Sequence, residues 1–406
     1  MSPPRSGQRK MKIALLLASI AFSAAAFLTL DWLRSAKILR SNVRDACTVR
    51  DPVRYTAFIP NCASIEHWGR DKYEFFTNSL GFRDEKIREV PLTDPRPRIL
   101  MLGSSFTEGK VAWRDSYVGK VAAQFPQYDF LNGGAAGYSP SNYLNVARMV
   151  LAKEVAIDEV IVSIGVADVY YEAAFYQDID ASGAVTGPAW TANLSYYTRN
   201  FIARHLMLTS YLLFEHHSIA KNHYQGVPTQ PANVFDVGPS AWTYRKVSDT
   251  KPWPSGYAPL GVEGGIAKEK AKMTLLWQEL EKRNIPISVV VFPYPAQIAY
   301  DTSESRHVRI WREWCEGKCK RFISVFPAFF AAKDQCPRSQ PDCWYQSLFT
   351  VGDTHYNAAG NALVADTVAK SLAGDPPIKR PGTNPRSESD PGLTSMSLKR
   401  WTSRTR

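Results

Sequence analysis

Four segments of the chain combine the polar and glycine residues that acyl-transfer chemistry needs. They read GSSFTEG at 103–109, NGGAAGYS at 132–139, GVADVYYE at 165–172 and GDTHYNAAGN at 352–361. A serine becomes a nucleophile when a base takes its hydroxyl proton, and a carboxylate holds that base in the correct tautomer. Asp353 and His355 can supply the carboxylate and the base from one turn, and Ser104 and Ser105 are the candidate nucleophiles. The alternative for such a serine is the N-cap of a helix.

Short apolar stretches and helical patterns alternate around these segments. The predicted elements are the strands Ile99–Leu102, Tyr128–Leu131 and Val160–Ile164 and the helices Ser116–Gln124 and Tyr143–Val155. Buried strands that alternate with helices indicate a parallel sheet covered on both faces. Ligands bind beyond the carboxyl ends of such strands, so we expect the four segments to meet on one rim. There the backbone N–H groups of a loop that opens a helix can stabilise an oxyanion.

The alternation stops at about residue 172 and resumes at about 262. The resumed pattern predicts the helices Lys268–Arg283, 304–318 and Asn357–Leu372 and the strands Ile285–Phe292 and Phe322–Phe326. The interruption, rich in aromatic residues and in Gly, Pro and Ser, is predicted to be a lid or substrate-recognition insertion. We therefore expect a three-layer α/β/α, flavodoxin-like domain over 98–372. A juxtamembrane and entry segment at 31–97, with a helix or linker at 31–44 and an irregular stretch at 45–97, would precede it, and a disordered basic tail at 373–406 would follow it.

The N-terminus predicts a membrane anchor. A basic stretch at 1–12 precedes the uncharged run 13–30, which at ~1.5 Å per residue spans roughly 27 Å, about one hydrocarbon core. A cleaved signal peptide is the alternative, because small residues at 23–26 could suit a peptidase, although the apolar run continues beyond them. We expect a transmembrane signal anchor, with the basic N-terminus in the cytoplasm.

The cysteines support export of the body. All six follow the apolar run, at Cys47, Cys62, Cys315, Cys319, Cys336 and Cys343. An even number after an export-like segment indicates disulfides in an oxidising compartment. Proximity favours pairing each cysteine with its neighbour in the chain, although six cysteines allow fifteen pairings. A zinc site is the alternative for the last four, but their spacing is irregular. We expect a bacterial inner-membrane protein, single-pass, with its body in the periplasm.

The distribution of charge argues against a nucleic-acid partner. The chain has a formal net charge of +11. The excess of Lys and Arg is confined to residues 1–44 and 375–406, so the body between them is net neutral. A neutral body with basic ends argues against a groove built for phosphates.

The order and wording of the four segments resemble the SGNH (GDSL) hydrolases over roughly residues 75–170 and 265–372. GSSFTEG resembles that family's first block, and the match implies that Ser105 is the nucleophile. LNGGAAGYS resembles the second block, which implies that the Gly134 N–H joins the Ser105 N–H in the oxyanion hole. GDTHYNAAGNALVA resembles the last block, which implies that Asp353 orients the base His355. TNSLGFRDE, at 77–85, resembles a segment often found upstream of the first block.

Two positions depart from the family pattern. The third block usually reads GxND and its asparagine donates to the oxyanion, whereas this chain has Ala167 followed by Asp168. Losing one oxyanion donor typically costs about 10²–10³ in rate. Asn132, Asn142 or a residue of the insertion could compensate. The second departure is Ser104, which stands where an aspartate is usual and is expected to keep a hydrogen bond in the turn.

The resemblance implies a serine-dependent esterase or O-acyltransferase that acts on O-acetyl groups of a cell-envelope or extracellular polysaccharide, with no cofactor and no metal. The rival reading, favoured by Ala167, is a catalytically weak or inactive fold that binds glycan or assembles with a polysaccharide-export machine. Other side chains invite a site but are expected to be surface or core residues. They are the histidines His205, His216, His217 and His223, as a metal site, and the aromatics Tyr170, Tyr171, Phe175 and Tyr176, as a sugar platform.

Overall fold

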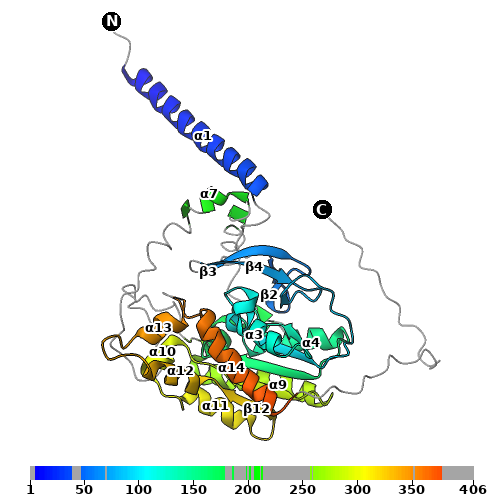
Figure 1. Cartoon of the computed structure of the whole chain (residues 1–406). Coiled ribbons are helices and arrows are strands. Elements are labelled where there is room, and N and C mark those ends of the chain that lie inside the picture. The colour runs from blue at the N-terminus through cyan, green and yellow to red at the C-terminus, as the bar shows by residue number, and fades with distance from the viewer. Residues whose placement is uncertain are drawn as a thin grey trace, which may run out of the picture.

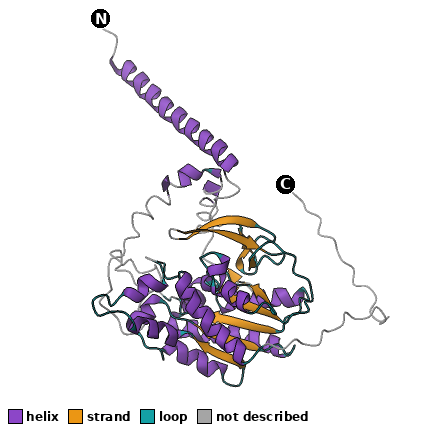
Figure 2. Cartoon of the chain, in the orientation of Figure 1, coloured by secondary structure: helices purple, strands orange, loops and turns teal. Residues whose placement is uncertain are grey.

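The computed structural model describes residues 5–38, 47–68, 71–178, 185–186, 198, 201–202, 205–210, 212–213, 257, 259–350 and 353–376. Most of the predicted insertion and the predicted tail from 377 onward therefore lie outside the described residues. Figures 1 and 2 show a body of helices and strands from which one long helix extends.

The body is built on an eight-stranded sheet of order β12-β11-β8-β6-β7-β5-β4-β3. Five strands are parallel: β6 (Arg98–Gly103), β7 (Asp129–Asn132), β8 (Glu159–Ile164), β11 (Ile287–Val291) and β12 (Cys319–Ser324). Each coincides with a predicted strand to within three residues, and the mostly parallel α/β architecture is confirmed. Every residue of β6, β7, β8 and β11 is buried, as expected of strands covered on both faces.

The prediction of an irregular segment over 45–97 is wrong, because short strands occur there from Thr48 onward. β1 (Thr48–Asp51) and β2 (Tyr55–Phe58) form a separate hairpin. β3 (Ala63–Trp68), β4 (Asp71–Thr77) and β5 (Arg83–Asp84) join the central sheet as antiparallel strands beyond β7. β3 and β4 escaped sequence analysis because they mix polar and aromatic residues and lack the continuous apolar runs of the parallel strands.

Helices cover both faces of the sheet, and alternate residues of β6 divide between the two cores. Ile99 and Met101 join a cluster that includes α3 (Tyr117–Gln124), α10 (Pro295–Tyr300), α12 (Phe326–Asp334), α13 (Cys343–Leu348) and α14 (Ala358–Gly374). Leu100 and Leu102 join the cluster of α4 (Pro140–Ala152), α9 (Gly261–Glu281) and α11 (Arg306–Cys315). Sequence analysis missed α10, α12 and α13, which are short helices on the first face. The three layers follow from this division.

The long helix α1 (Arg5–Ile38) contains the predicted anchor (Figure 1). Its segment Lys10–Ser35 is long and apolar enough to cross a membrane, and none of its most apolar stretch is buried against the body. A signal sequence would pass the same test, so anchor and signal remain the two readings of this helix.

The described part of the predicted insertion contains only short elements. α5 (Ala167–Tyr170) and η2 (Tyr171–Phe175) lead into the two-residue strands β9 (Gln177–Asp178) and β10 (Val185–Thr186), and α7 (Met207–Ser210) lies beside α1. The side chains of Tyr170 and Tyr176 are buried and pack with their neighbours, which is core packing. His205 lies against Phe201. His216, His217, His223 and the predicted lid lie outside the described residues.

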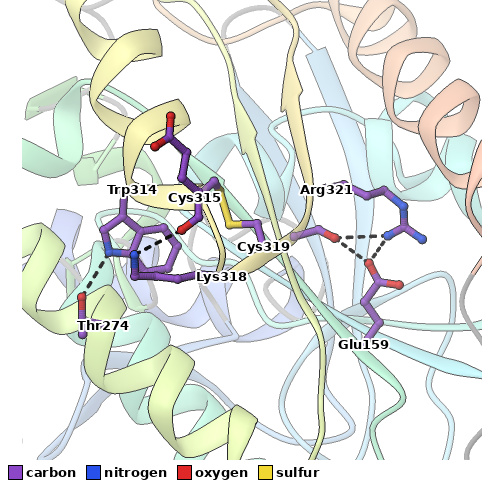
Figure 3. The surroundings of a disulfide bond; sticks show 9 residues. Glu159, Thr274, Trp314, Cys315, Lys318, Cys319 and Arg321 are labelled. Carbon is purple, nitrogen blue, oxygen red and sulfur yellow. Dashed lines mark hydrogen bonds and ion pairs between the residues drawn. A yellow bond between two sulfur atoms is a disulfide. The ribbon is translucent and has the colours of Figure 1, made fainter.

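All six cysteines form disulfides, in the neighbour pairs that proximity favours: Cys47–Cys62, Cys315–Cys319 and Cys336–Cys343. The zinc alternative therefore does not hold for the last four. Figure 3 shows how the second disulfide joins the end of α11 to the start of the edge strand β12. Next to it, Trp314 Nε1 donates to Thr274 Oγ1 of α9 at 3.1 Å, and Arg321 of β12 pairs with Glu159 of β8 (Figure 3). The outer edge of the parallel sheet is thus tied to its centre.

Candidate active site

Ser105 lies where the chain leaves the central strand β6. The sheet order places β7 on one side of β6 and β8 on the other, so the strand order reverses at β6, and ligands of open α/β sheets bind at such a switch point. Ser105 is the first residue of the short helix α2 (Ser105–Glu108), and it is half-buried. Gly103 permits this turn, because a Cβ there would lie 2.0 Å from Thr107 Oγ1 and 3.1 Å from the Ser163 carbonyl oxygen.

Ser105, His355 and Asp353 form a continuous hydrogen-bonded chain. Ser105 Oγ lies 2.7 Å from His355 Nε2, and His355 Nδ1 lies 2.7 Å from Asp353 Oδ1. Asp353 Oδ1 also accepts from the backbone N–H groups of Thr354 and His355, at 2.5 and 3.2 Å. The two ends of this chain are 250 residues apart in the sequence. This is the arrangement in which a base can take the serine proton while a carboxylate holds its other nitrogen.

The charge state of Asp353 suits that role. Burial raises the pKa of this carboxyl, but the neighbouring His355 ring and the hydrogen bonds from His355 and Thr354 outweigh burial and hold the pKa well below its usual range. Asp353 therefore stays ionised at neutral pH. It can accept from His355 Nδ1 and stabilise the imidazolium that forms when Nε2 takes a proton.

His355 is held by backbone bonds and by aromatic rings on two sides. Its carbonyl accepts from Thr350 N–H at 2.8 Å, just before α14 begins. Phe106 stacks on the imidazole with ring centroids 4.9 Å apart, and Trp68 contacts it edge-on with centroids 4.8 Å apart. Sequence analysis named neither aromatic residue as part of the site. Phe106 could have been found, because it directly follows the predicted nucleophile.

The loop after β7 lies against α2, but the Gly134 N–H is already engaged. It donates to Asn132 Oδ1 at 3.1 Å, within its own loop. A Cβ on Gly134 would lie 2.8 Å from the backbone nitrogen of Glu108, so only glycine allows this loop to pack on the helix that carries Ser105. To serve an oxyanion, the Gly134 N–H would have to share or leave its present bond.

Gly137 in the same loop has a freer N–H. Within the described residues, the N–H groups of residues 133–136 and of Tyr138 all donate to protein oxygens, whereas no bond from the Gly137 N–H is found. Its φ of +78° favours glycine. Sequence analysis passed over Gly137, although the spacing NxGxxG contains it as the second glycine.

Neither asparagine that could compensate for Ala167 is arranged to do so. Asn132 Nδ2 donates to the Thr107 carbonyl at 2.8 Å, and Asn142 Nδ2 donates to the Arg54 carbonyl at 2.7 Å. Ala167 itself is the buried first residue of α5, at the end of β8. At the position where the family pattern has a donor, this rim therefore presents a methyl group.

The expectation that Ser104 keeps a side-chain hydrogen bond is wrong. Ser104 is the N-cap of α2, and its carbonyl accepts from the N–H groups of Thr107 and Glu108. Its buried Oγ has no hydrogen-bond partner in the described structure. The backbone of Ser104, and not its hydroxyl, organises the turn before the nucleophile.

Asp168 belongs to a buried group of carboxyls behind the rim. Tyr143 donates to Asp168 Oδ2 at 2.7 Å, and Glu172 accepts from Ser139 and Ser141. Burial raises the pKa of Asp168 well above its usual range, and burial together with the charges of Asp168 and Glu172 does the same for Glu269. These groups are fully enclosed, so they pack the core behind the site.

Comparison with known proteins leaves the site's own geometry as the main guide. No protein-family profile matches the chain, and no curated protein matches it either. Among solved structures, a mutant acetylxylan esterase from Geobacillus stearothermophilus is 13% identical, with a TM-score of 0.37 over 68% of this chain and 94% of that one. The esterase EstA from a Pseudoalteromonas species is 10% identical, with a TM-score of 0.34 over 68% and 97%. TesA is 10% identical, with a TM-score of 0.35 over 68% and 98%. At these scores, the similarities carry no functional argument.

Proposed function

We propose that this protein is a serine-dependent hydrolase or acyltransferase that acts on ester bonds. The observation that carries the proposal is the hydrogen-bonded chain Ser105–His355–Asp353, which joins the end of β6 to the turn before α14. The three side chains are bonded in the order that nucleophilic catalysis requires, and all three remain partly accessible. The resemblance of the surrounding segments to the SGNH hydrolases supports the same chemistry.

The mechanism follows from the tautomer that Asp353 selects. The Nδ1–H of His355 donates a hydrogen bond to Asp353, and the proton stays on the imidazole. Its Nε2 is then free to accept the Ser105 hydroxyl proton as Oγ attacks the ester carbonyl. The tetrahedral intermediate collapses when the imidazolium returns that proton to the leaving alcohol, which leaves an acyl-serine. Water or a sugar hydroxyl then gives up its proton to His355 and attacks the acyl-serine. The imidazolium returns this proton to Ser105 Oγ as the acyl–serine bond breaks, which leaves the acyl group on the water or sugar oxygen and regenerates Ser105.

The oxyanion would be stabilised by backbone donors. The Ser105 N–H is at the start of a helix, where N–H groups have no partner within the helix. The second donor comes from the loop after β7. Gly134 is the residue that the family pattern implies, and Gly137 has the freer N–H. The methyl group of Ala167 contributes nothing, so we expect a slower enzyme than one that has asparagine there.

The substrate is proposed to be an O-acetylated polysaccharide of the cell envelope or exterior. The disulfides and the apolar helix α1 support an extracytoplasmic body, and in the bacterial periplasm such polymers are within reach of a membrane-anchored enzyme. Whether water or sugar takes the acyl group depends on how well the site excludes water from the acyl-serine.

Turnover of an acetyl ester tests this proposal. Release of acetate and transfer to a sugar would be measured with an activated acetyl donor, with and without an oligosaccharide acceptor. We expect Ser105→Ala and His355→Ala each to remove the activity, while Ser104→Ala, which changes the adjacent unpartnered hydroxyl, retains it. Turnover that survives Ser105→Ala would refute the proposed mechanism.

A second candidate function is favoured by Ala167. Without the third oxyanion donor, the same rim could bind an acylated glycan without turning it over, as a partner in polysaccharide export. This reading predicts oligosaccharide binding by calorimetry together with no Ser105-dependent turnover. Turnover that depends on Ser105 would exclude it.

A further inference from the structure

The hairpin formed by β3 and β4 contributes a side chain, that of Trp68, to the candidate active site. β3 and β4 pair in register from Ala63 with Phe76 to Trp68 with Asp71, so Trp68 lies at the tip of the hairpin. There its ring contacts the His355 imidazole edge-on, with an interplanar angle of 82°. The hairpin lies beyond the parallel strands, at the far end of the sheet order from β12 (Figure 1). The contact of Trp68 with His355 places the tip of this hairpin at the rim.

Trp68 is in turn connected to the loop after β7. Lys110 Nζ lies 5.0 Å from the centroid of the Trp68 ring, within the range of a cation–π contact. Lys110 forms an ion pair with Glu108 Oε1, and Glu108 Oε2 accepts from the Ala136 N–H at 2.7 Å. Both charged residues are buried, with 3% of Glu108 and 8% of Lys110 exposed. Such a pair is costly to break, since removing one partner leaves an uncompensated buried charge.

Arg83 connects the β3–β4 hairpin to residues 108–111, which follow the short helix that begins at Ser105. Its guanidinium donates to the carbonyls of Glu108, Gly109 and Val111. The same guanidinium lies over the rings of Tyr73 and Phe75 of β4. Arg83 belongs to the segment TNSLGFRDE, to which the proposed mechanism gives no role. Residues 108–111, which follow the helix start at Ser105, therefore contact the β3–β4 hairpin in two places. Lys110 contacts Trp68, and Arg83 connects the carbonyls of this segment to the rings of β4.

We propose that Trp68, Lys110 and Glu108 form a positioning brace. The brace connects the base His355 to residues 133–138, the loop after β7 that would supply an oxyanion donor and is called the oxyanion loop below. The contacts run from His355 through Trp68, Lys110 and Glu108 to Ala136, which lies between the two candidate oxyanion donors Gly134 and Gly137. The brace holds the imidazole and the oxyanion loop at a constant separation around Ser105. A misplacement of 1 Å can cost about 10²-fold in rate, so such positioning matters for catalysis. This proposal rests on the proposed function, since it assigns residues that serve the same site.

A small active-site probe separates positioning from substrate binding. A fluorophosphonate reacts with an activated serine and contains no sugar, so its labelling rate reports on Ser105, His355 and the oxyanion donors alone. Trp68→Ala and Lys110→Met are expected to lower the labelling rate and kcat by about 10–100-fold, with little change in KM. Trp68→Phe keeps an aromatic ring against His355 and is expected to restore most of the rate.

The chain offers a matched control. Lys318 directly precedes β12, at the amino end of the parallel strands and not at their carboxyl ends, and it lies 5.9 Å from the ring of Trp277 and 5.8 Å from that of Trp314. Trp277→Ala and Lys318→Met remove a similar pair and are expected to label at the wild-type rate. Thermal melting of each full-length variant, in detergent or nanodiscs, shows whether it is folded. If Trp68→Ala does not fold, Lys110→Met and Trp68→Phe still decide the outcome.

Two results would overturn the brace. Labelling of folded Trp68→Ala or Lys110→Met within about a factor of two of wild type would show that these residues do not position the site. A normal labelling rate with a raised KM for a saccharide ester would make Trp68 a substrate platform instead. Absence of labelling in the wild-type protein is a different failure, because it would refute the proposed function itself.

Discussion

The proposed nucleophile side of the rim and the proposed oxyanion side differ in how completely their groups are arranged for catalysis. On the first side, Ser105, His355 and Asp353 are joined by two bonds of 2.7 Å, and the carboxylate is kept ionised. On the second side, the Gly134 N–H is bound within its own loop, and Ala167 offers no donor. In the proposed mechanism, activation of Ser105 is therefore arranged in advance, whereas the candidate oxyanion donors among the described residues are backbone N–H groups.

This difference indicates that formation of the tetrahedral oxyanion, and not activation of the serine, limits the proposed reaction. Oxyanion stabilisation is usually the largest single contribution to acyl-transfer catalysis. A site with a complete nucleophile side and a reduced oxyanion side should acylate readily with reactive probes and slowly with ordinary esters. The comparison can be tested by three substitutions. They remove the carboxylate that orients His355, add an oxyanion donor at position 167, and neutralise the buried carboxyl of Glu269.

Replacing Asp353 by Asn should have the largest effect. The amide cannot hold the Nδ1–H tautomer of His355 as the carboxylate does, and the comparable change in a serine protease lowers kcat by about 10⁴-fold. We expect a loss of this order in kcat for acetyl ester hydrolysis, with KM nearly unchanged. A loss smaller than about tenfold would mean that Asp353 does not orient the base.

The same variant should also change the dependence of stability on pH. The pKa of Asp353 is depressed in the folded protein, so its contribution to stability is present above the usual aspartate pKa and is lost as the pH falls through the folded value. Asp353→Asn should therefore lower the melting temperature at pH 7, and the difference from wild type should shrink towards about pH 3. A difference that is constant with pH would contradict this.

Replacing Ala167 by Asn should repair the oxyanion side. If its side chain reaches the oxyanion, the new donor should raise kcat by about tenfold or more, since losing one donor typically costs 10²–10³. The rate of fluorophosphonate labelling should rise less, because the probe is already reactive. Ala167→Leu provides a control of similar size without a donor. Equal activity in the Asn and Leu variants would show that position 167 does not face the oxyanion.

Replacing Glu269 by Gln should have the smallest effect, and on stability alone. Both carboxyl oxygens of Glu269 lack a hydrogen-bond partner within the described structure. Since its folded pKa is raised, Glu269 costs stability as the pH rises above the usual glutamate pKa. The Gln variant should be more stable than wild type at pH 8, and the two proteins should have nearly equal stability near pH 4. Reduced stability of the variant at pH 8 would contradict the conclusion that the pKa of Glu269 is raised in the folded protein.

The sequence predicted those parts of the fold that depend on continuous apolar runs. Strands such as Val160–Ile164 are buried on both faces and announce themselves by composition, and all five parallel strands were found. The antiparallel strands β3 and β4 were missed, since a half-exposed extension mixes polar residues such as Glu66 and Lys72 with aromatic ones. In β4, exposed Lys72 and Glu74 alternate with buried Tyr73 and Phe75, a period-two pattern that a search for continuous apolar runs does not detect.

For the site, the sequence indicated residue types better than their contacts. Ser105, His355 and Asp353 were singled out by motif, and the structure brings their side chains together. The engagement of Gly134, the unpartnered Ser104 hydroxyl and the approach of Trp68 to His355 were not foreseen. Each of these depends on how loops and a hairpin fold back over the rim, and no local spacing encodes that.

The central claim, that Ser105 is an activated nucleophile, is tested most directly by covalent labelling. The full-length protein would be treated with a fluorophosphonate, digested and analysed by mass spectrometry. We predict a single modified peptide that contains Ser105, with labelling absent in Ser105→Ala and strongly slowed in His355→Ala. An unlabelled wild-type protein, or equal labelling of the Ser105→Ala variant, would contradict the account.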